Sequence, residues 1–118
     1  MIKNKTYFVD IDGTIIKYRA FSDLKTIKPV PVQDVIDFLN KEKTINGAYI
    51  VITSARPKVL EAHTKKELKQ VGIKYDALLL GVGRGARIVV NDIPQGSTEK
   101  KALGLNLIRN KGLKGAKY

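Results

Sequence analysis

Short, β-rich apolar runs alternate along this chain with segments of helical periodicity, and few folds accept that order. The apolar runs lie at residues 6–10, 48–53, 76–80, 88–92 and 103–107. After the first run, apolar residues from Val32 to Leu39 recur at i, i+3, i+4 and i+7, as in a helix with one buried face, and a second apolar stripe follows the second run, at Val59, Leu60, Leu68 and Val71. Strand–helix–strand order with right-handed crossovers gives a parallel sheet. We therefore expect an α/β, Rossmann-like three-layer sandwich, with a parallel sheet of about five strands and helices on both faces.

The last two runs define the fourth and fifth expected strands. Residues 48–53 are almost unbroken in apolar character, which is typical of a parallel strand covered on both faces, and Ile88, Val89 and Val90 indicate a further buried strand over residues 88–92. Leu103, Leu105 and Leu107 alternate with Gly104 and Asn106, which predicts a strand. A helix that starts at Glu99 is the competing interpretation of this segment.

Proline and glycine mark where the two expected helices begin and end. Pro31 and Pro57 stand where proline is tolerated, in a first helical turn. Asn46-Gly47 is expected to end the first helix, and Gly72 the second, because glycine readily takes the left-handed conformation of a helix C-cap.

Length and composition indicate one globular domain over residues 1–118. Apolar residues make up 43% of the chain and charged residues 28%, which excludes low-complexity and disordered classes. No apolar stretch approaches the roughly 20 residues of a membrane span. An aspartate at position 10 interrupts the amino terminus before a signal peptide could form. The absence of cysteine excludes disulfides and thiolate sites and fits a reducing, cytoplasmic location.

The charge is strongly positive. The chain has 22 Lys+Arg against 11 Asp+Glu, a formal net charge of +11. Such a surplus attracts phosphorylated small molecules and nucleic acids. The basic tail from about residue 110 has two open interpretations, a solvated and mobile terminus or a nucleic-acid contact. We expect no membrane partner, and an oligomer stays open.

Polar side chains follow three of the expected strands. They are Asp10 and Asp12, Thr53 and Ser54, and Asn91 and Asp92. Because the carboxyl ends of parallel strands meet at one edge of a sheet, we expect these groups to converge. Carboxylate and amide oxygens suit a hard divalent ion such as Mg²⁺. A simple Asx-capped turn is the structural alternative for Asp10-Ile-Asp12-Gly13-Thr14, but chance produces this pattern only about once in 10⁵–10⁶ positions.

These motifs resemble those of the haloacid dehalogenase-like (HAD) phosphohydrolase superfamily. Asp10-Ile-Asp12-Gly13-Thr14 matches its first motif, Ile52-Thr53-Ser54-Ala55-Arg56-Pro57 its second, and Val89-Val90-Asn91-Asp92 its fourth. The stretch from Tyr75 to Arg109 is similar to small capless phosphatases of sugar-phosphate or capsule metabolism. The opening motif is also similar to that of the phosphatase half of bacteriophage polynucleotide kinases.

The resemblance implies a Mg²⁺-dependent phosphomonoester hydrolase without a cap domain. Asp10 would be the nucleophile that forms an aspartyl-phosphate, and Asp12 the general acid and base. Ser54 would bind a phosphoryl oxygen, with Gly13, Thr14, Thr53 and Arg56 as further phosphate-binding candidates. Asp10, Asp12, Asp92 and Asn91 would surround the metal.

The chain departs from the family pattern in two places. No lysine stands shortly before Asp92, where the third motif normally supplies one. Arg84 is our candidate for that cation, because arginine binds phosphate with two parallel hydrogen bonds. The alternatives are the lysines of the second helix, Lys65, Lys66 and Lys69. The second acidic residue expected after Asp92 is also missing, and Asn91 is the candidate substitute.

Three functions remain open from the sequence. The first is hydrolysis of a sugar phosphate or nucleotide. A nucleic-acid 3′-end phosphatase is the second, favoured by the charge and by a site without a cap. The third is a non-catalytic, polyanion-binding module with the same fold, favoured by the missing lysine.

Overall fold

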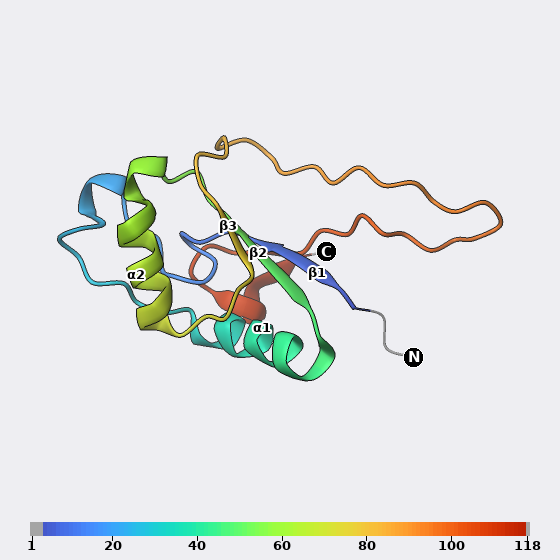
Figure 1. The fold of residues 1–118 in the computed structure, drawn as a ribbon, viewed down its shortest axis with the longest axis horizontal. Coiled ribbons are helices and arrows are strands. Elements are labelled where there is room, and N and C mark those ends of the chain that lie inside the picture. Colours follow the sequence, from blue (N-terminus) through green and yellow to red (C-terminus); the bar gives the residue numbers. More distant parts are fainter. Residues whose placement is uncertain (1–3, 118) are drawn as a thin grey trace.

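The computed structural model describes residues 4–117 and has an α/β fold built on a parallel three-stranded sheet (Figure 1). The strands are β1 (Thr6–Val9), β2 (Tyr49–Thr53) and β3 (Ala77–Leu79), with β2 in the middle. Helix α1 (Gln33–Asn46) connects β1 to β2, and α2 (Glu61–Val71) connects β2 to β3. The first three expected strands, the two helices and the parallel pairing are confirmed.

Both helices end at the glycines that the sequence predicts. Gly47 and Gly72 are the C-caps of α1 and α2, with φ values of 69° and 79°. Glycine takes this left-handed conformation without the steric cost of a Cβ. Pro57 directly precedes a short 3-10 helix, η2 (Lys58–Leu60), that leads into α2.

The helices cover one face of the sheet. Ile50 and Ile52 of β2 are fully buried in a cluster to which both helices contribute, through residues such as Ile36 and Leu68. The opposite face is open, and Phe8, Tyr49 and Leu79 expose 60%, 50% and 54% of their surface there. The expectation of helices on both faces is therefore wrong for this sheet. The strands follow one another across the sheet in chain order, and right-handed crossovers then place successive helices on the same side.

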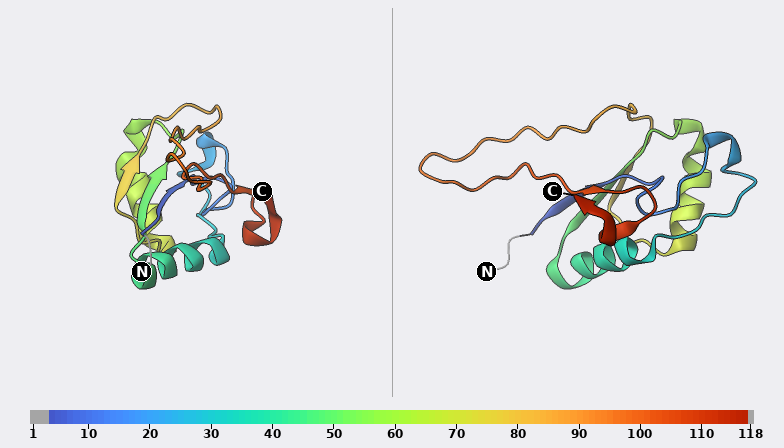
Figure 2. Two further views of the ribbon diagram at one scale, coloured as in Figure 1. Left: turned by 90° about the vertical axis from the view of Figure 1, so that its right-hand side faces the viewer. Right: turned by 180° about the vertical axis from the view of Figure 1, so that it is seen from behind.

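Residues 86–105, which we call the arm, form a long excursion without regular secondary structure. Figure 1 and the reversed view of Figure 2 show the arm in orange, extending away from the sheet and helices. It gives the molecule a longest dimension of 53 Å against 30 and 26 Å. The radius of gyration, 15.0 Å, exceeds the value of about 13.5 Å expected for a compact chain of this length.

The expected fourth strand at residues 88–92 is therefore wrong in this structure, since these residues lie in the arm and pair with nothing in the sheet. Apolar composition predicts that a segment can form a strand, but pairing also requires a connection that delivers it to a free edge. The expected fifth strand is reduced to β4 (Asn106–Leu107), which pairs antiparallel with β5 (Ala116–Lys117) outside the main sheet.

The basic tail packs against α1. A 3-10 helix, η3 (Gly112–Gly115), lies beside α1, and the backbone N–H of Leu113 donates to Asp34 Oδ2 at 3.0 Å. The Leu113 side chain packs against the main hydrophobic cluster. None of the described helices has the length and apolar character needed to cross a membrane.

Candidate functional site

The loop after β1 presents Asp10 and Asp12 at the carboxyl edge of the sheet. The Ile11 carbonyl accepts hydrogen bonds from the backbone N–H groups of the next residues, including Thr14 at 3.1 Å, and so folds the loop back on itself. Gly13 has a φ of 93°, and its carbonyl accepts a hydrogen bond from Asn110 at 2.9 Å. A Cβ at Gly13 would lie 3.1 Å from Arg109 Cγ. Glycine is therefore required by both the conformation and the close approach.

Asp12 is held by a two-point contact with Arg56, which follows β2. Arg56 Nε donates to Asp12 Oδ2 at 3.0 Å, and Arg56 Nη2 donates to Asp12 Oδ1 at 2.8 Å. The Arg56 side chain is fully buried. Paired, parallel hydrogen bonds of this kind fix both the position and the plane of a carboxylate. The sequence selected both residues for the site, and the structure brings them into contact.

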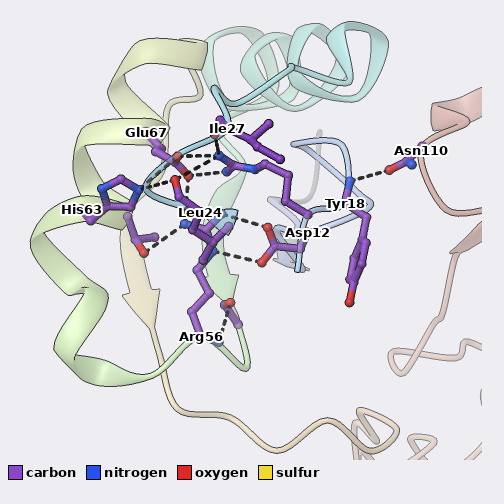
Figure 3. A network of polar contacts seen from close by, with 11 residues as sticks. Asp12, Tyr18, Leu24, Ile27, Arg56, His63, Glu67 and Asn110 are labelled. Carbon is purple, nitrogen blue, oxygen red and sulfur yellow. Dashed lines mark hydrogen bonds and ion pairs between the residues drawn. The ribbon is translucent and has the colours of Figure 1, made fainter. Parts of the chain in front are cut away.

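The contact continues into a buried network that the sequence did not predict (Figure 3). Arg56 Nη1 donates to Glu67 Oε1 at 3.0 Å and to Thr64 Oγ1 at 3.2 Å. Arg19 donates to both carboxylate oxygens of Glu67, at 2.6 and 2.9 Å. In Figure 3, Arg56 lies between Asp12 and Glu67, so one guanidinium joins the loop after β1 to helix α2.

The same network fixes residues 19–27, the segment that leads toward α1. Arg19 Nη1 donates to the carbonyl oxygens of Leu24 and Ile27, at 3.3 and 2.5 Å. His63 Nε2 lies 3.0 Å from the Leu24 carbonyl and 3.2 Å from Glu67 Oε2. Arg19 Nε is the buried side-chain polar atom without a hydrogen-bond partner among residues 4–117.

Glu67 is the acid on which both arginines converge. Burial alone would raise the pKa of Glu67, but hydrogen bonds from Arg19 and Arg56 outweigh it and hold the pKa below its ordinary value. Glu67 is 2% exposed. One signal could have revealed it, since Glu67 lies on the buried face of α2 beside Thr64 and Leu68. A charged side chain on a buried helix face needs partners of opposite charge.

Asp10 retains solvent-exposed surface, but the loops around it withdraw part of its hydration. This partial burial raises the pKa of Asp10, against the opposing effects of the Ile11 N–H and the positive charge of Arg87. The negative charge of Asp12, like burial, raises the pKa of Asp10. Arg87 was not among the sequence candidates, although it stands only three residues after Arg84. Its guanidinium donates to the carbonyl oxygens of Gly83 and Gly85, at 2.6 and 2.7 Å.

Ser54 and Thr53 are buried at the end of β2. Ser54 Oγ accepts the backbone N–H of Arg56 at 3.0 Å, so its own hydroxyl hydrogen remains available to donate. The Ser54 carbonyl accepts Val82 N–H at 3.0 Å, which ties the loop after β3 to the same edge of the sheet. Thr14 is half-buried in the loop after β1.

Two arginine–aromatic pairs lie on the loops around the site. The Arg109 guanidinium stands 4.0 Å from the ring centre of Tyr18, and the Arg84 guanidinium 4.5 Å from that of Phe21. Arg84 was expected to take the place of the missing lysine, but the structure places its charge over an aromatic ring. A guanidinium over a ring face is a favourable electrostatic contact.

The structure does not bring Asp92 and Asn91 to Asp10 and Asp12. Both lie in the arm and are exposed. Within residues 4–117, no group of three or more His, Cys, Asp or Glu side chains could hold a metal ion. The Asp12 carboxylate is moreover occupied by Arg56 on both oxygens. The residues of one chain therefore do not fit the expected Mg²⁺ site, because the fourth expected strand, which would deliver Asp92, is not in the sheet.

Comparisons with known proteins give one structural likeness. No family model and no curated protein matches the sequence. A protein from Vibrio cholerae, described only as a crystallographic target, superposes with a TM-score of 0.52 at 28% sequence identity. The match covers 65% of this chain and 69% of that one. It supports a shared α/β arrangement and names no activity.

Proposed function

We propose that this protein is a HAD-like phosphomonoester hydrolase that works through an aspartyl-phosphate on Asp10. The observation that supports it best is the pairing of two carboxylates with different surroundings at the carboxyl edge of a parallel sheet. Asp10 reaches solvent beside the cation Arg87, and Asp12 is fixed by buried Arg56. One carboxylate is thus accessible for attack, and the other is positioned for proton transfer.

The proposed reaction has two displacement steps. A carboxylate oxygen of Asp10 attacks phosphorus, the bond to the leaving oxygen breaks, and Asp12 gives that oxygen a proton. Water then attacks phosphorus, Asp12 takes its proton, and inorganic phosphate leaves with the Asp10 carboxylate restored. Both oxygens of Asp12 accept from Arg56, which is the geometry of an ionised carboxylate suited to the second step. For the first step, one oxygen of Asp12 must leave Arg56.

Two groups are placed to hold the transferred phosphoryl group. The Ser54 hydroxyl can donate to a phosphoryl oxygen while it accepts the Arg56 N–H. Arg87 supplies a positive charge beside Asp10 and is the better candidate for the role of the missing lysine, because Arg84 lies over Phe21. This charge would reduce the repulsion between an anionic nucleophile and an anionic phosphate.

The family resemblance implies a dependence on Mg²⁺, but the described residues of one chain do not complete a site for the ion. At this edge of the sheet, one chain offers a metal ion only the Asp10 carboxylate and the backbone of its loop, because the Asp12 carboxylate is bound to Arg56.

The test is hydrolysis of a generic aryl phosphate in the presence of Mg²⁺. We expect Asp10→Asn to lower kcat by at least about 10³-fold, because the amide is not a nucleophile. Asp37→Asn is the matched control, because Asp37 lies exposed on α1 with Gln33 as its hydrogen-bond partner. Equal activity in wild type and Asp10→Asn would contradict the role of Asp10. No activity in either protein over a broad panel of phosphates would contradict the proposal and leave the polyanion-binding module.

A nucleic-acid 3′ end is the second candidate substrate, favoured by the two arginine–aromatic pairs. Single-stranded bases stack on aromatic rings and guanidinium planes. Tyr18 exposes 40% of its surface next to the Asp12 loop. This substrate predicts that Tyr18→Ala raises KM for a 3′-phosphorylated oligonucleotide by about tenfold, with no change for an aryl phosphate.

A further inference from the structure

The arm exposes more large apolar side chains than a solvated loop requires. Ile88, Val90 and Leu103 are 81%, 88% and 77% exposed, and Ile93 and Leu105 are 55% and 47% exposed. Gathered exposed apolar residues of this kind mark interaction surfaces in soluble proteins.

The sheet offers a complementary surface. Strand β1 is an edge strand, since the order is β1-β2-β3. An edge strand presents unpaired backbone groups that another strand can use. The open face beside this edge carries Phe8 and Tyr49, which expose 60% and 50% of their surface.

The arm of the same chain is poorly placed to reach this edge. A parallel strand needs a crossover of roughly a dozen residues, and only residues 80–87 lie between β3 and Ile88. These residues are already fastened at the carboxyl edge of the sheet. Gly81 and Val82 donate to the carbonyls of Arg56 and Ser54 at 2.9 and 3.0 Å, and the Arg87 side chain bonds Gly83 and Gly85.

We propose that two copies of this chain exchange their arms, each arm pairing with the free edge of β1 in the other copy. Parallel pairing that sets Ile88 beside Thr6 and Val90 beside Phe8 brings Asp92 level with Asp10. Asp92 of the second copy would then supply the acidic group that one chain lacks at Asp10 and Asp12. The exchange itself stands on the exposed surfaces, whereas the role of Asp92 rests on the proposed function.

The available area is sufficient for a stable dimer. Burying a Val, Ile, Leu or Phe side chain removes on the order of 60–120 Å² of apolar surface from water. The exposed apolar residues of one arm and one open sheet face therefore supply on the order of 500 Å², and reciprocal exchange about twice that. With polar surface included, this lies within the roughly 1,200–2,000 Å² of stable interfaces. Reciprocal exchange also closes the assembly as a two-fold dimer.

Disulfide trapping tests the exchange without reference to activity. The natural chain has no cysteine, so Thr6→Cys together with Ile88→Cys creates one reactive pair. After oxidation we expect a covalent dimer of twice 13.1 kDa on a non-reducing gel. Lys41→Cys with Ile88→Cys is the control, because Lys41 lies exposed on α1, and it should stay monomeric. An intramolecular disulfide, or no disulfide, overturns the proposal.

Light scattering on the full-length chain gives the oligomeric state directly. Wild type should be a dimer, and Ile88→Lys/Val90→Lys a folded monomer by circular dichroism. Gln95→Lys/Thr98→Lys adds the same charge elsewhere in the arm and should remain a dimer. A monomeric wild type at the concentrations of the activity assay overturns the proposal.

Subunit complementation tests the shared site. Asp10→Asn and Asp92→Asn proteins are each expected to be inactive and are then unfolded together and refolded. Exchange predicts about a quarter of wild-type activity, because half of the dimers carry one intact site of two. No recovered activity with an active wild type overturns the role of Asp92 in the shared site and leaves the hydrolase standing. Conversely, an intermolecular disulfide with an inactive wild type overturns the hydrolase and leaves the exchange.

Discussion

At the scale of single residues, Glu67 sets the charge balance of the buried network. It accepts hydrogen bonds from Arg19 and Arg56, and Arg56 in turn holds Asp12. Two cations and two anions therefore share one buried region. Removing one member of such a group leaves an uncompensated charge, which costs more than the intact arrangement contributes.

We expect Glu67→Gln to lower the free energy of unfolding by about 3 kcal/mol at neutral pH, measured by urea denaturation. Glu61→Gln on the same helix is the control, since Glu61 is 61% exposed and its pair with Lys65 is 3.8 Å long. Its expected effect is below about 1 kcal/mol. Equal effects of the two substitutions would show that the buried network does not stabilise the fold.

The same pair of proteins gives a pH dependence. The pKa of Glu67 is lower in the folded protein than in the unfolded chain. The contribution of ionised Glu67 to the free energy of unfolding is therefore present above the ordinary glutamate pKa of about 4.3. It is lost as the pH falls through the lower pKa of Glu67 in the folded protein. The difference in unfolding free energy between wild type and Glu67→Gln should shrink in acid, and a constant difference would contradict this assignment.

At the scale of elements, a side chain of β1 fastens the strand to α1. The Tyr7 hydroxyl donates to Glu42 Oε1, and the Tyr7 ring meets Phe38 edge to face. Burial, the hydrogen bond to Glu42 and the charge of that carboxylate together raise the pKa of Tyr7 to about 12.

Tyr7→Phe should therefore lower the free energy of unfolding by about 1 kcal/mol below pH 10. Because the folded pKa lies above the unfolded value of 10.0, this contribution is lost as the pH rises from 10.0 to about 12. Unfolding in urea across this range checks it, together with absorbance titration of the tyrosines. A difference that grows with pH would contradict the assigned hydrogen bond.

The junction of η3 with α1 depends on a single glycine. Gly112 has a φ of 65°, and a Cβ there would overlap Asp34 Oδ1. We expect Gly112→Ala to destabilise the protein by about 2 kcal/mol, through left-handed strain and displacement of Asp34. Gly104→Ala is the control, because a Cβ there meets nothing within 4 Å. Thermal denaturation of the two variants measures the difference.

The elements divide into those that local sequence predicts and those that it does not. Residues 48–53 and the glycine ends of both helices follow from apolar pattern and backbone conformation, and they are confirmed. Ile88 to Asp92 has an equally good strand pattern, but its pairing depends on an eight-residue connection and on which edge is free. The Arg56–Asp12 contact joins two predicted site residues. The role of Glu67 could not be predicted, because its partners, Arg19 and Arg56, are distant in sequence.

At the scale of the whole molecule, arm exchange would couple stability to protein concentration. A dimer that unfolds to separate chains has a melting temperature that rises with concentration, because mass action favours the assembled state. Wild type should show this rise in calorimetry, and Ile88→Lys/Val90→Lys should not. A melting temperature independent of concentration in both proteins would contradict the dimer.

The loop that carries Asp10 and Asp12 is held in place by residues that lie nearly a hundred positions further along the chain. Asn110 N–H donates to the Gly13 carbonyl at 2.9 Å, and Asn110 Oδ1 accepts the Tyr18 N–H at 2.6 Å. Arg109 covers the Tyr18 ring. A nascent chain that has not yet emerged from the ribosome through residue 110 lacks these contacts. During translation, Asp10 and Asp12 are therefore held in place only after residue 110 has left the ribosome.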